Sequence, residues 1–164
     1  MKHPNDIQKL GELIEEIRIA MLVTVAKDGT LHSRPMGTQM EDFDGTLWFF
    51  TEANSGKAEE IDTEERVNVI YSEPKRELFV SVSGNASLVF DRAEMKKRWN
   101  PLYHAWFPKG LEDPNIALLK VSVEKAEYWE TPASKVIQLA GFAKAILTGK
   151  RYKPEQHEKF TLPH

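Results

Sequence analysis

The feature that most constrains the fold of this chain is a succession of short β-prone runs joined by tight turns. Two dipeptides, Asp28-Gly29 and Asp44-Gly45, separate neighbouring runs, and Asp-Gly is typical of a two-stranded antiparallel hairpin. Because strands joined by short turns pair side by side, the pattern predicts an antiparallel sheet closed into a small barrel. The expected strands cover residues 20–26, 30–40, 46–51, 66–72, 78–90 and 116–130, the last run being long enough for one strand or two.

Helical periodicity appears at four other places. In the first of them apolar residues recur every three or four positions, which is the pattern of an amphipathic helix. Pro101 is expected to end or kink the third helix, because proline lacks a backbone donor. Gly84, in the middle of a long strand, indicates a bulge or a tight bend. The expected helices cover residues 5–19, 54–65, 91–106 and 134–147.

Length and composition narrow the classes of function. The 164 residues are expected to form one domain (1–164), with a core over about 6–148 and a polar, loosely held tail over 149–164. A formal net charge of -3 gives no support to binding of nucleic acid or an anionic membrane. The absence of cysteine excludes thiolate catalysis and Cys-ligated metals, and the histidines show no metal-binding spacing. Because the N-terminus has no apolar signal segment, a cytoplasmic location is expected.

The first candidate site is Ser33-Arg34-Pro35-Met36, inside an expected strand. Proline donates no hydrogen bond to a sheet, so it belongs on an edge strand or at a bulge, and Arg34 then stands where the ladder opens. An arginine there can form a forked contact to a phosphate or a carboxylate. Taken alone, a surface arginine on an edge strand is the commoner interpretation.

The second candidate is the junction between the third strand and the second helix, from Thr51 to Lys57. Free backbone N–H groups at a helix start, with the Ser55 hydroxyl and the Lys57 ammonium, favour the binding of a phosphate. The segment is not a Walker A loop, because Glu52 stands near the place of its first glycine and Ala58 follows the lysine. An ordinary helix cap with a solvated lysine is the alternative.

Aromatic side chains are the third candidate. The chain has four tryptophans and eight phenylalanines, and filling the barrel is the commoner role for any one of them. Trp106 and Trp129 lie near a loop and a strand end. These two are therefore the better candidates to contact a flat ligand.

The order and spacing of these motifs resemble the pyridoxamine 5′-phosphate oxidase-like split barrels, and among them the general-stress-protein branch. The similarity spans about residues 6–160. The segments that carry it are, in chain order, SRPM at 33–36, FFT at 49–51, SGKA at 55–58, RVNVIYS at 66–72, VSG at 82–84, AEYWE at 126–130 and the ending LTGKRY to EQHEKF.

The resemblance implies a mainly β fold, a six-stranded antiparallel split β-barrel with flanking helices. It also implies a homodimer that binds two FMN molecules in clefts between its subunits. With Trp106 added from the aromatic set, the expected FMN contacts are Arg34, Pro35, Met36, Gly37, Thr38, Phe50, Thr51, Ser55, Lys57, Trp106 and Trp129.

Within this set the resemblance implies distinct roles. Arg34 would contact the phosphate or the ribityl chain, and Ser55 and Lys57 the phosphate. Phe50 would line the flavin, and Trp129 would reach it from the neighbouring subunit.

Two departures argue against oxidation of pyridoxamine phosphate itself. Gly56 stands where those oxidases carry a further arginine, and in residues 131–139 only Lys135 is basic, where they carry arginine and histidine. The expected function is therefore FMN-dependent oxidoreduction of another small molecule, in a stress-related role. A non-catalytic FMN store or sensor is one alternative, and a split barrel that binds haem or deazaflavin is another. No catalytic residue is assigned.

Overall fold

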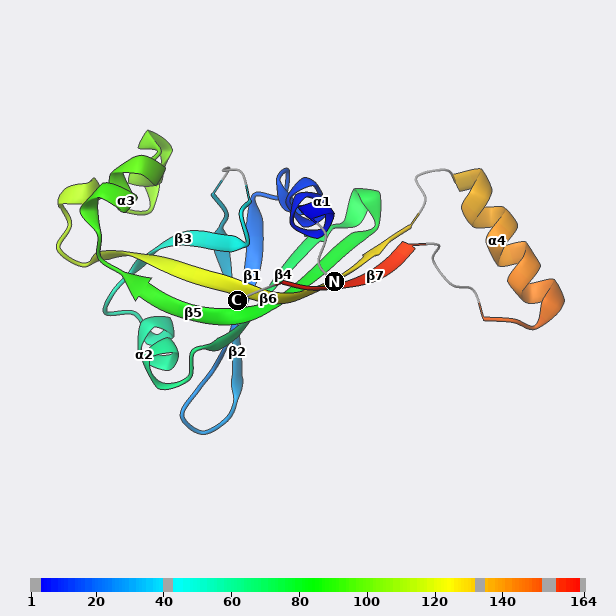
Figure 1. The fold of residues 1–164 in the computed structure, drawn as a ribbon, viewed down its shortest axis with the longest axis horizontal. Helices are drawn as coiled ribbons and strands as arrows, with labels where there is room; N and C mark the ends of the chain where they lie inside the picture. Colours follow the sequence, from blue (N-terminus) through cyan, green and yellow to red (C-terminus); the bar gives the residue numbers. More distant parts are fainter. Residues whose placement is uncertain (1–3, 40–42, 132–134, 152–155, 163–164) are drawn as a thin grey trace.

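The structure is a computed structural model that describes residues 4–39, 43–131, 135–151 and 156–162. Its strands form one curled antiparallel sheet in the order β2-β1-β4-β5-β6-β3, with β7 paired to β6 (Figure 1). This is the expected split barrel, a half-barrel of six strands, with one strand added. The strands are β1 (Ile19–Val25), β2 (Leu31–Gly37), β3 (Thr46–Glu52), β4 (Arg66–Glu73), β5 (Leu78–Val89), β6 (Ile116–Glu130) and β7 (Gln156–Thr161).

Four α-helices flank the sheet: α1 (Pro4–Ile14), α2 (Gly56–Thr63), α3 (Arg92–Arg98) and α4 (Lys135–Thr148). The first is shorter than expected, because Ile17 is buried in the link to β1 instead of on the helix. The third stops before Pro101, and the chain continues as a 3-10 turn from Pro101 to Ala105. Further 3-10 turns cover Pro74–Arg76 and Gly110–Glu112.

Alternation of side chains along the strands builds the main core. In β5, Leu78, Val80 and Val82 point inward and are almost fully buried, while the residues between them are more exposed. Gly84 lies at a register shift between β5 and β6, which confirms the predicted bulge. A Cβ atom at that position would lie 2.2 Å from the backbone oxygen of Ser122. Only glycine allows the two strands to approach this closely.

The structure differs from the loosely held polar tail expected over residues 149–164, because part of that segment forms a strand. The strand β7 pairs with the second half of β6, and Phe160 and Leu162 are buried in the main core. The ring of Phe160 stacks on Tyr128, with 5.6 Å between ring centroids. Polar and charged residues together dominate the segment, so two apolar anchors fix a strand that composition alone does not reveal.

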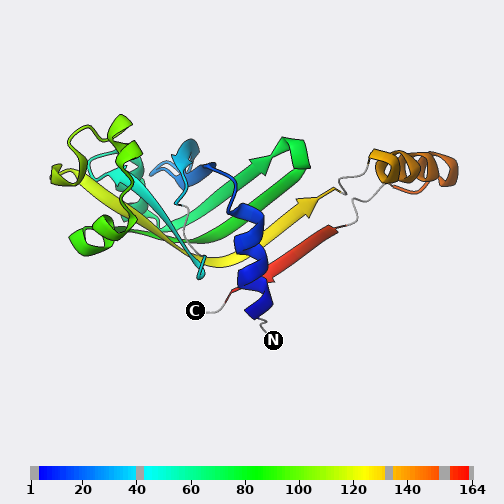
Figure 2. The same cartoon turned by 90° about the horizontal axis from the view of Figure 1, so that it is seen from above.

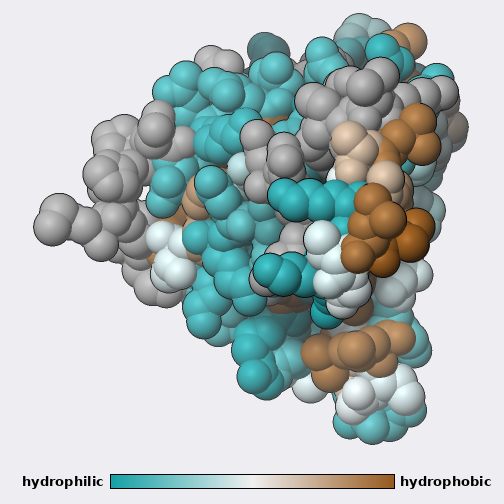
Figure 3. Space-filling model, turned by 90° about the vertical axis from the view of Figure 1, so that its right-hand side faces the viewer, coloured by the Kyte–Doolittle hydropathy of each residue, from teal (hydrophilic) through white to brown (hydrophobic). Residues whose placement is uncertain are grey.

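The helix α4 lies at one end of the molecule, beyond the paired strands β6 and β7, and the α3 lobe lies at the other end (Figures 1 and 2). Seen from the α4 end, apolar side chains gather on one side of the surface (Figure 3). The exposed apolar residues of α4 are Leu139, Phe142, Ile146 and Leu147.

Candidate functional site

The predicted ligand Arg34 lies on β2, beside β1, and its guanidinium is held by two neighbours. One terminal nitrogen donates to Thr24 Oγ1 at 2.6 Å, and the other donates to Glu60 Oε2 at 2.9 Å. Thr24 comes from β1, and Glu60 comes from α2, which packs on β1. The guanidinium is therefore fixed between the sheet and the second helix.

Glu60 is the centre of this cluster. Its Oε2 also accepts a hydrogen bond from the Thr24 hydroxyl, and its Oε1 lies 2.6 Å from Nδ1 of His32. Burial alone would raise the pKa of the Glu60 carboxyl, but hydrogen bonds from its three partners hold that pKa below its ordinary value. The group is therefore a carboxylate at neutral pH. We call Thr24, His32, Arg34 and Glu60 the Glu60 cluster.

The start of α2 forms as the sequence predicts, with Ser55 as the N-cap residue. Its hydroxyl donates to the backbone oxygen of Glu52 at 2.7 Å, so it caps no helical N–H group. The N–H groups of Gly56 and Lys57 have no hydrogen-bond partner among the residues that the structure describes. These two donors are free to bind an anion.

Lys57 lies near Arg34, at the same helix start. Burial lowers the pKa of the Lys57 ammonium, and the positive charge of Arg34 lowers it further, while Glu52 partly offsets both effects. Two cations that repel each other in a half-buried place favour the binding of an anion between them. The structure thus places Arg34, Ser55 and Lys57 in one region of the fold.

The end of β3 contributes a buried polar atom. Thr51 is 2% exposed, and its Oγ1 has no hydrogen-bond partner in the part of the chain that the structure describes. Its neighbour Phe50 points into a second apolar cluster under the α3 lobe, where it meets Trp99 edge-on at 5.3 Å. Of the two residues, only Thr51 offers a group that a bound ligand would satisfy.

The remaining predicted residues lie in different parts of the fold. On β2, Met36 is buried while Pro35 and Gly37 are exposed, because neighbouring residues of a strand face opposite sides. The hydroxyl of Thr38 donates to the backbone oxygen of Ile17. Trp106 follows the second 3-10 turn and is 70% exposed.

Trp129 lies far from the α2 start within one chain. Thr51 pairs with Ala117 near the beginning of β6, and Trp129 comes about 12 residues later, roughly 40 Å along the strand at 3.3 Å per residue. There the indole stacks on His157, with ring centroids 5.2 Å apart. One chain therefore does not join Trp129 to the other predicted ligands.

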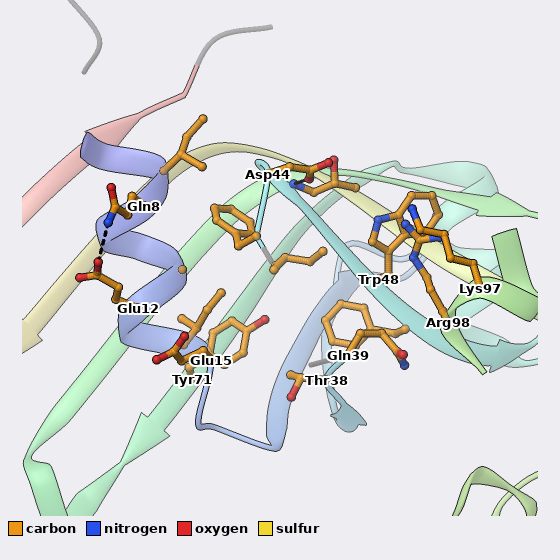
Figure 4. Close-up of a pocket in the computed structure, with 17 residues that line it drawn as sticks. Gln8, Glu12, Glu15, Thr38, Gln39, Asp44, Trp48, Tyr71, Lys97 and Arg98 are labelled. Carbon is orange, nitrogen blue, oxygen red and sulfur yellow. Dashed lines mark hydrogen bonds between the residues drawn. The ribbon is translucent and has the colours of Figure 1, made fainter. Parts of the chain in front are cut away.

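A pocket of about 500 Å³ opens between α1, the beginning of β3 and α3. Figure 4 shows Trp48, Lys97 and Arg98 together at one end of it, and Glu12 and Glu15 of α1 at the other. The guanidinium of Arg98 lies 4.1 Å from the centre of the Trp48 ring. Among the predicted site residues, only Thr38 lines this pocket, so the pocket is separate from the Glu60 cluster.

Sequence reasoning missed three members of the Glu60 cluster. His32 precedes Arg34 by two residues and therefore shares its face of β2, and Thr24 is its cross-strand partner. Glu60 follows Lys57 by three residues, which places both on one side of α2. These spacings are the signal that the sequence offers for the Glu60 cluster. They indicate a cluster only once α2 is known to pack on β1.

Two kinds of feature are absent from the part of the chain that the structure describes. Within the described ranges, no group of three or more side chains is arranged to hold a metal ion. No helix in the same ranges is long and apolar enough to cross a membrane.

Comparison with known proteins extends these observations. Protein bli-3 of Neurospora crassa is 30% identical over 154 residues, which are 88% of this chain and 74% of that protein. The solved general stress FMN/FAD binding protein of Xanthomonas citri has a TM-score of 0.69 and 33% identity, over 79% of this chain and 92% of that one.

A Clostridium acetobutylicum protein related to general stress protein 26 has a TM-score of 0.72 at 16% identity, over 98% of this chain and 97% of that one, and so shows the fold alone. The family described as "Pyridoxamine 5′-phosphate oxidase like" matches residues 5–153. With the split barrel already established by its own strands, the chain belongs to the pyridoxamine 5′-phosphate oxidase-like family.

Proposed function

We propose that this protein binds FMN at the α2 start and uses it to oxidise or reduce a small molecule in a stress-related role in the cytoplasm. The observation that carries the proposal is that Arg34, Lys57 and two free N–H groups gather at one helix start. The buried, unpartnered hydroxyl of Thr51 supports it, because a bound ligand would supply the missing partner. The relative from Xanthomonas citri, named as binding FMN or FAD, gives further support.

The residues present fit the phosphate of FMN. Each charge-assisted hydrogen bond contributes about 1.5–3 kcal/mol net, and micromolar affinity corresponds to about -8 kcal/mol. Lys57, the two N–H groups and the buried surface of a flat ring together reach this range. Bound FMN would supply the electron transfer, while the chain would supply orientation and charge.

The proposal includes a homodimer with the flavin between subunits. Trp129 cannot reach the α2 start of its own chain, so its contact with flavin requires a second copy. Trp129 is the cross-strand partner of Phe79 on β5. The side of the sheet that carries these two residues also exposes further apolar side chains. We call this set the outer apolar face; it consists of Ile19, Met21, Ile70 and Phe79.

The absorption spectrum of the purified protein tests the cofactor directly. Flavin bands are expected after incubation with FMN, and a Soret band would instead indicate haem. Replacing both cations, Arg34→Ala with Lys57→Ala, should weaken FMN binding by 10-fold or more, on the order of 1.5 kcal/mol. The matched control, Arg66→Ala with Lys75→Ala, removes the same charge from exposed positions and should change the affinity little. Equal affinities of the two double variants would contradict the phosphate assignment.

A non-catalytic flavin store is the second candidate, and one observation favours it. Gly56 stands where pyridoxamine-phosphate oxidases carry a further arginine, and the position of its absent Cβ atom meets open space. Loss of the flavin absorbance on addition of NADH or NADPH, and its return with an electron acceptor, would support the oxidoreductase. Retained flavin that no donor reduces would support the store.

A further inference from the structure

Arg34 does not offer its full positive charge to a ligand. Its guanidinium contacts the Glu60 carboxylate at 2.9 Å, with side-chain exposures of 22% and 13%. A carboxylate this close cancels much of the attraction between Arg34 and an incoming oxyanion. The ionic state of the Glu60 cluster therefore controls how strongly Arg34 contributes to the binding of an anion.

His32 is the imidazole of the cluster, a side chain that exists either neutral or with a positive charge. Its Nδ1 lies 2.6 Å from the second Glu60 oxygen, and the ring is 52% exposed, so protons reach it directly from solvent. Imidazole is the side chain that ordinarily gains or loses its charge between about pH 5 and 8. Protonation of His32 places a second cation on Glu60, opposite Arg34.

The charges around the α2 start show what protonation of His32 changes. With His32 neutral, two cations and two anions face one another at the α2 start: Arg34, Lys57, Glu52 and Glu60. Asp28, in the turn before β2, is linked to His32 through Thr30, whose hydroxyl donates to Asp28 Oδ1 and lies 3.5 Å from Nε2 of His32. Protonation of His32 adds one positive charge to this balance, within reach of both Glu60 oxygens.

We propose that His32 and Glu60 form a proton-controlled pair that sets how much positive charge Arg34 presents to a dianionic oxyanion bound beside Lys57. With His32 protonated, its charge satisfies Glu60 and leaves more of the Arg34 charge for the ligand. Affinity for a phosphate ester therefore increases as the pH falls through the imidazole range. The inference rests on the proposed function only in naming FMN as that phosphate ester.

The test compares FMN with riboflavin, which lacks the phosphate, at pH 8.5 and pH 6.5. A phosphate ester loses its second charge only near pH 6, so FMN remains mainly dianionic over this range. We expect the ratio of FMN affinity to riboflavin affinity to rise by about threefold at the lower pH, the size of a partly exposed charge interaction. The variant His32→Gln should remove this rise, whereas His104→Gln, which alters an exposed histidine of the α3 lobe, should keep it. An equal rise in the parent and in His32→Gln would overturn the proposal.

Glu60 is tested with a control on the same helix. Glu60→Gln removes the opposing charge, so the affinity ratio should already be raised at pH 8.5, by about threefold over the parent. Glu64→Gln removes a carboxylate that pairs with the exposed Arg66 at the end of α2, and it should leave the ratio unchanged. A raised ratio in both variants, or in neither, would contradict control by Glu60.

Sulfate separates failure of this inference from failure of the proposed function. Sulfate remains a dianion at both pH values, and its binding can be followed in the parent and in every variant through the backbone amide NMR signals of Gly56 and Lys57. Tighter sulfate binding at pH 6.5 in the parent, absent in His32→Gln, supports the proton-controlled pair even if the chain binds no flavin. Flavin binding without this pH dependence would support the proposed function and overturn the inference.

Discussion

At the scale of single residues, the buried hydroxyl of Thr51 has no hydrogen-bond partner among the described residues, and this lowers the stability of the free chain. An unsatisfied buried polar group costs about 1–3 kcal/mol. Thr24 differs, because its hydroxyl donates to Glu60 and accepts from Arg34. Two buried threonines of the same sheet, Thr24 on β1 and Thr51 on β3, therefore have opposite effects on stability.

Replacing each threonine with valine tests this difference. Thr51→Val should raise the free energy of unfolding of the free protein by about 1 kcal/mol, because it removes the unsatisfied group. The same change should weaken FMN binding, since the ligand loses a hydrogen bond. Thr24→Val should lower the free energy of unfolding by about 1–3 kcal/mol. Urea unfolding and FMN titration give both quantities, and a loss of stability in Thr51→Val would show that its hydroxyl has a partner in solution.

The cations of the site could be predicted from the sequence, but their surroundings could not. Arg34 and Lys57 stand in a recognisable order of motifs, and the helix start at Ser55 follows from its cap residue. Glu60 is one of many acidic residues in a charged helix, and nothing local separates it from Glu59 or Glu64. Its contact with Arg34 depends on the packing of α2 against β1, which joins segments 26 positions apart.

At the scale of elements, the close approach of β5 and β6 depends on Gly84. The position that a side chain would occupy is already filled by the backbone of Ser122. Backbone atoms in a paired strand cannot move aside as a flexible side chain can, so the strands must separate if a Cβ atom is added. The bulge fixes where the long strands bend.

Gly84→Ala tests this element. The added methyl group should lower the free energy of unfolding by about 1–3 kcal/mol, the usual cost of overpacking. Gly56→Ala is the control, because its Cβ atom meets open space at the start of a helix, and it should change stability by less than about 1 kcal/mol. Equal urea midpoints for the two variants would show that the strands tolerate separation at the bulge.

The elements that the sequence predicted are those with a local signal. Alternating apolar residues and Asp-Gly turns identify the strands from β1 to β6, and Pro101 marks the end of the third helix. The strand β7 has no such signal, because Phe160 and Leu162 are isolated apolar residues in a polar segment. The position of β7 depends on its pairing with the free edge of β6, and that edge lies more than twenty residues earlier in the chain.

At the scale of the whole molecule, the outer apolar face bears on whether the protein acts as a single chain or as a dimer. Met21 and Ile70 are cross-strand partners on β1 and β4, and both are exposed in the single chain. Contiguous apolar surface on a soluble protein marks an interaction site. The proposed homodimer would cover this face with a second copy of the chain.

Ile70→Lys should therefore convert the protein to a monomer without unfolding it, because the side chain already faces outward. Sedimentation velocity should show half the parent's mass, and FMN affinity should fall by about 10-fold or more as the partner's aromatic contact is lost. Leu102→Lys places the same charge on an exposed leucine of the 3-10 turn after α3 and should leave the mass unchanged. A parent that sediments as a monomer would contradict the dimer.

The order of strands also has a consequence for synthesis of the chain. The strand β3 ends at Glu52, but its partner in the sheet is β6, which begins at Ile116. A ribosome adds about 5–20 residues per second, so the nascent β3 waits several seconds for that partner to emerge. During this interval its apolar side chains are exposed to solvent, and contacts this distant in sequence also form slowly. Protection of the growing chain against aggregation therefore matters most between the making of these two strands.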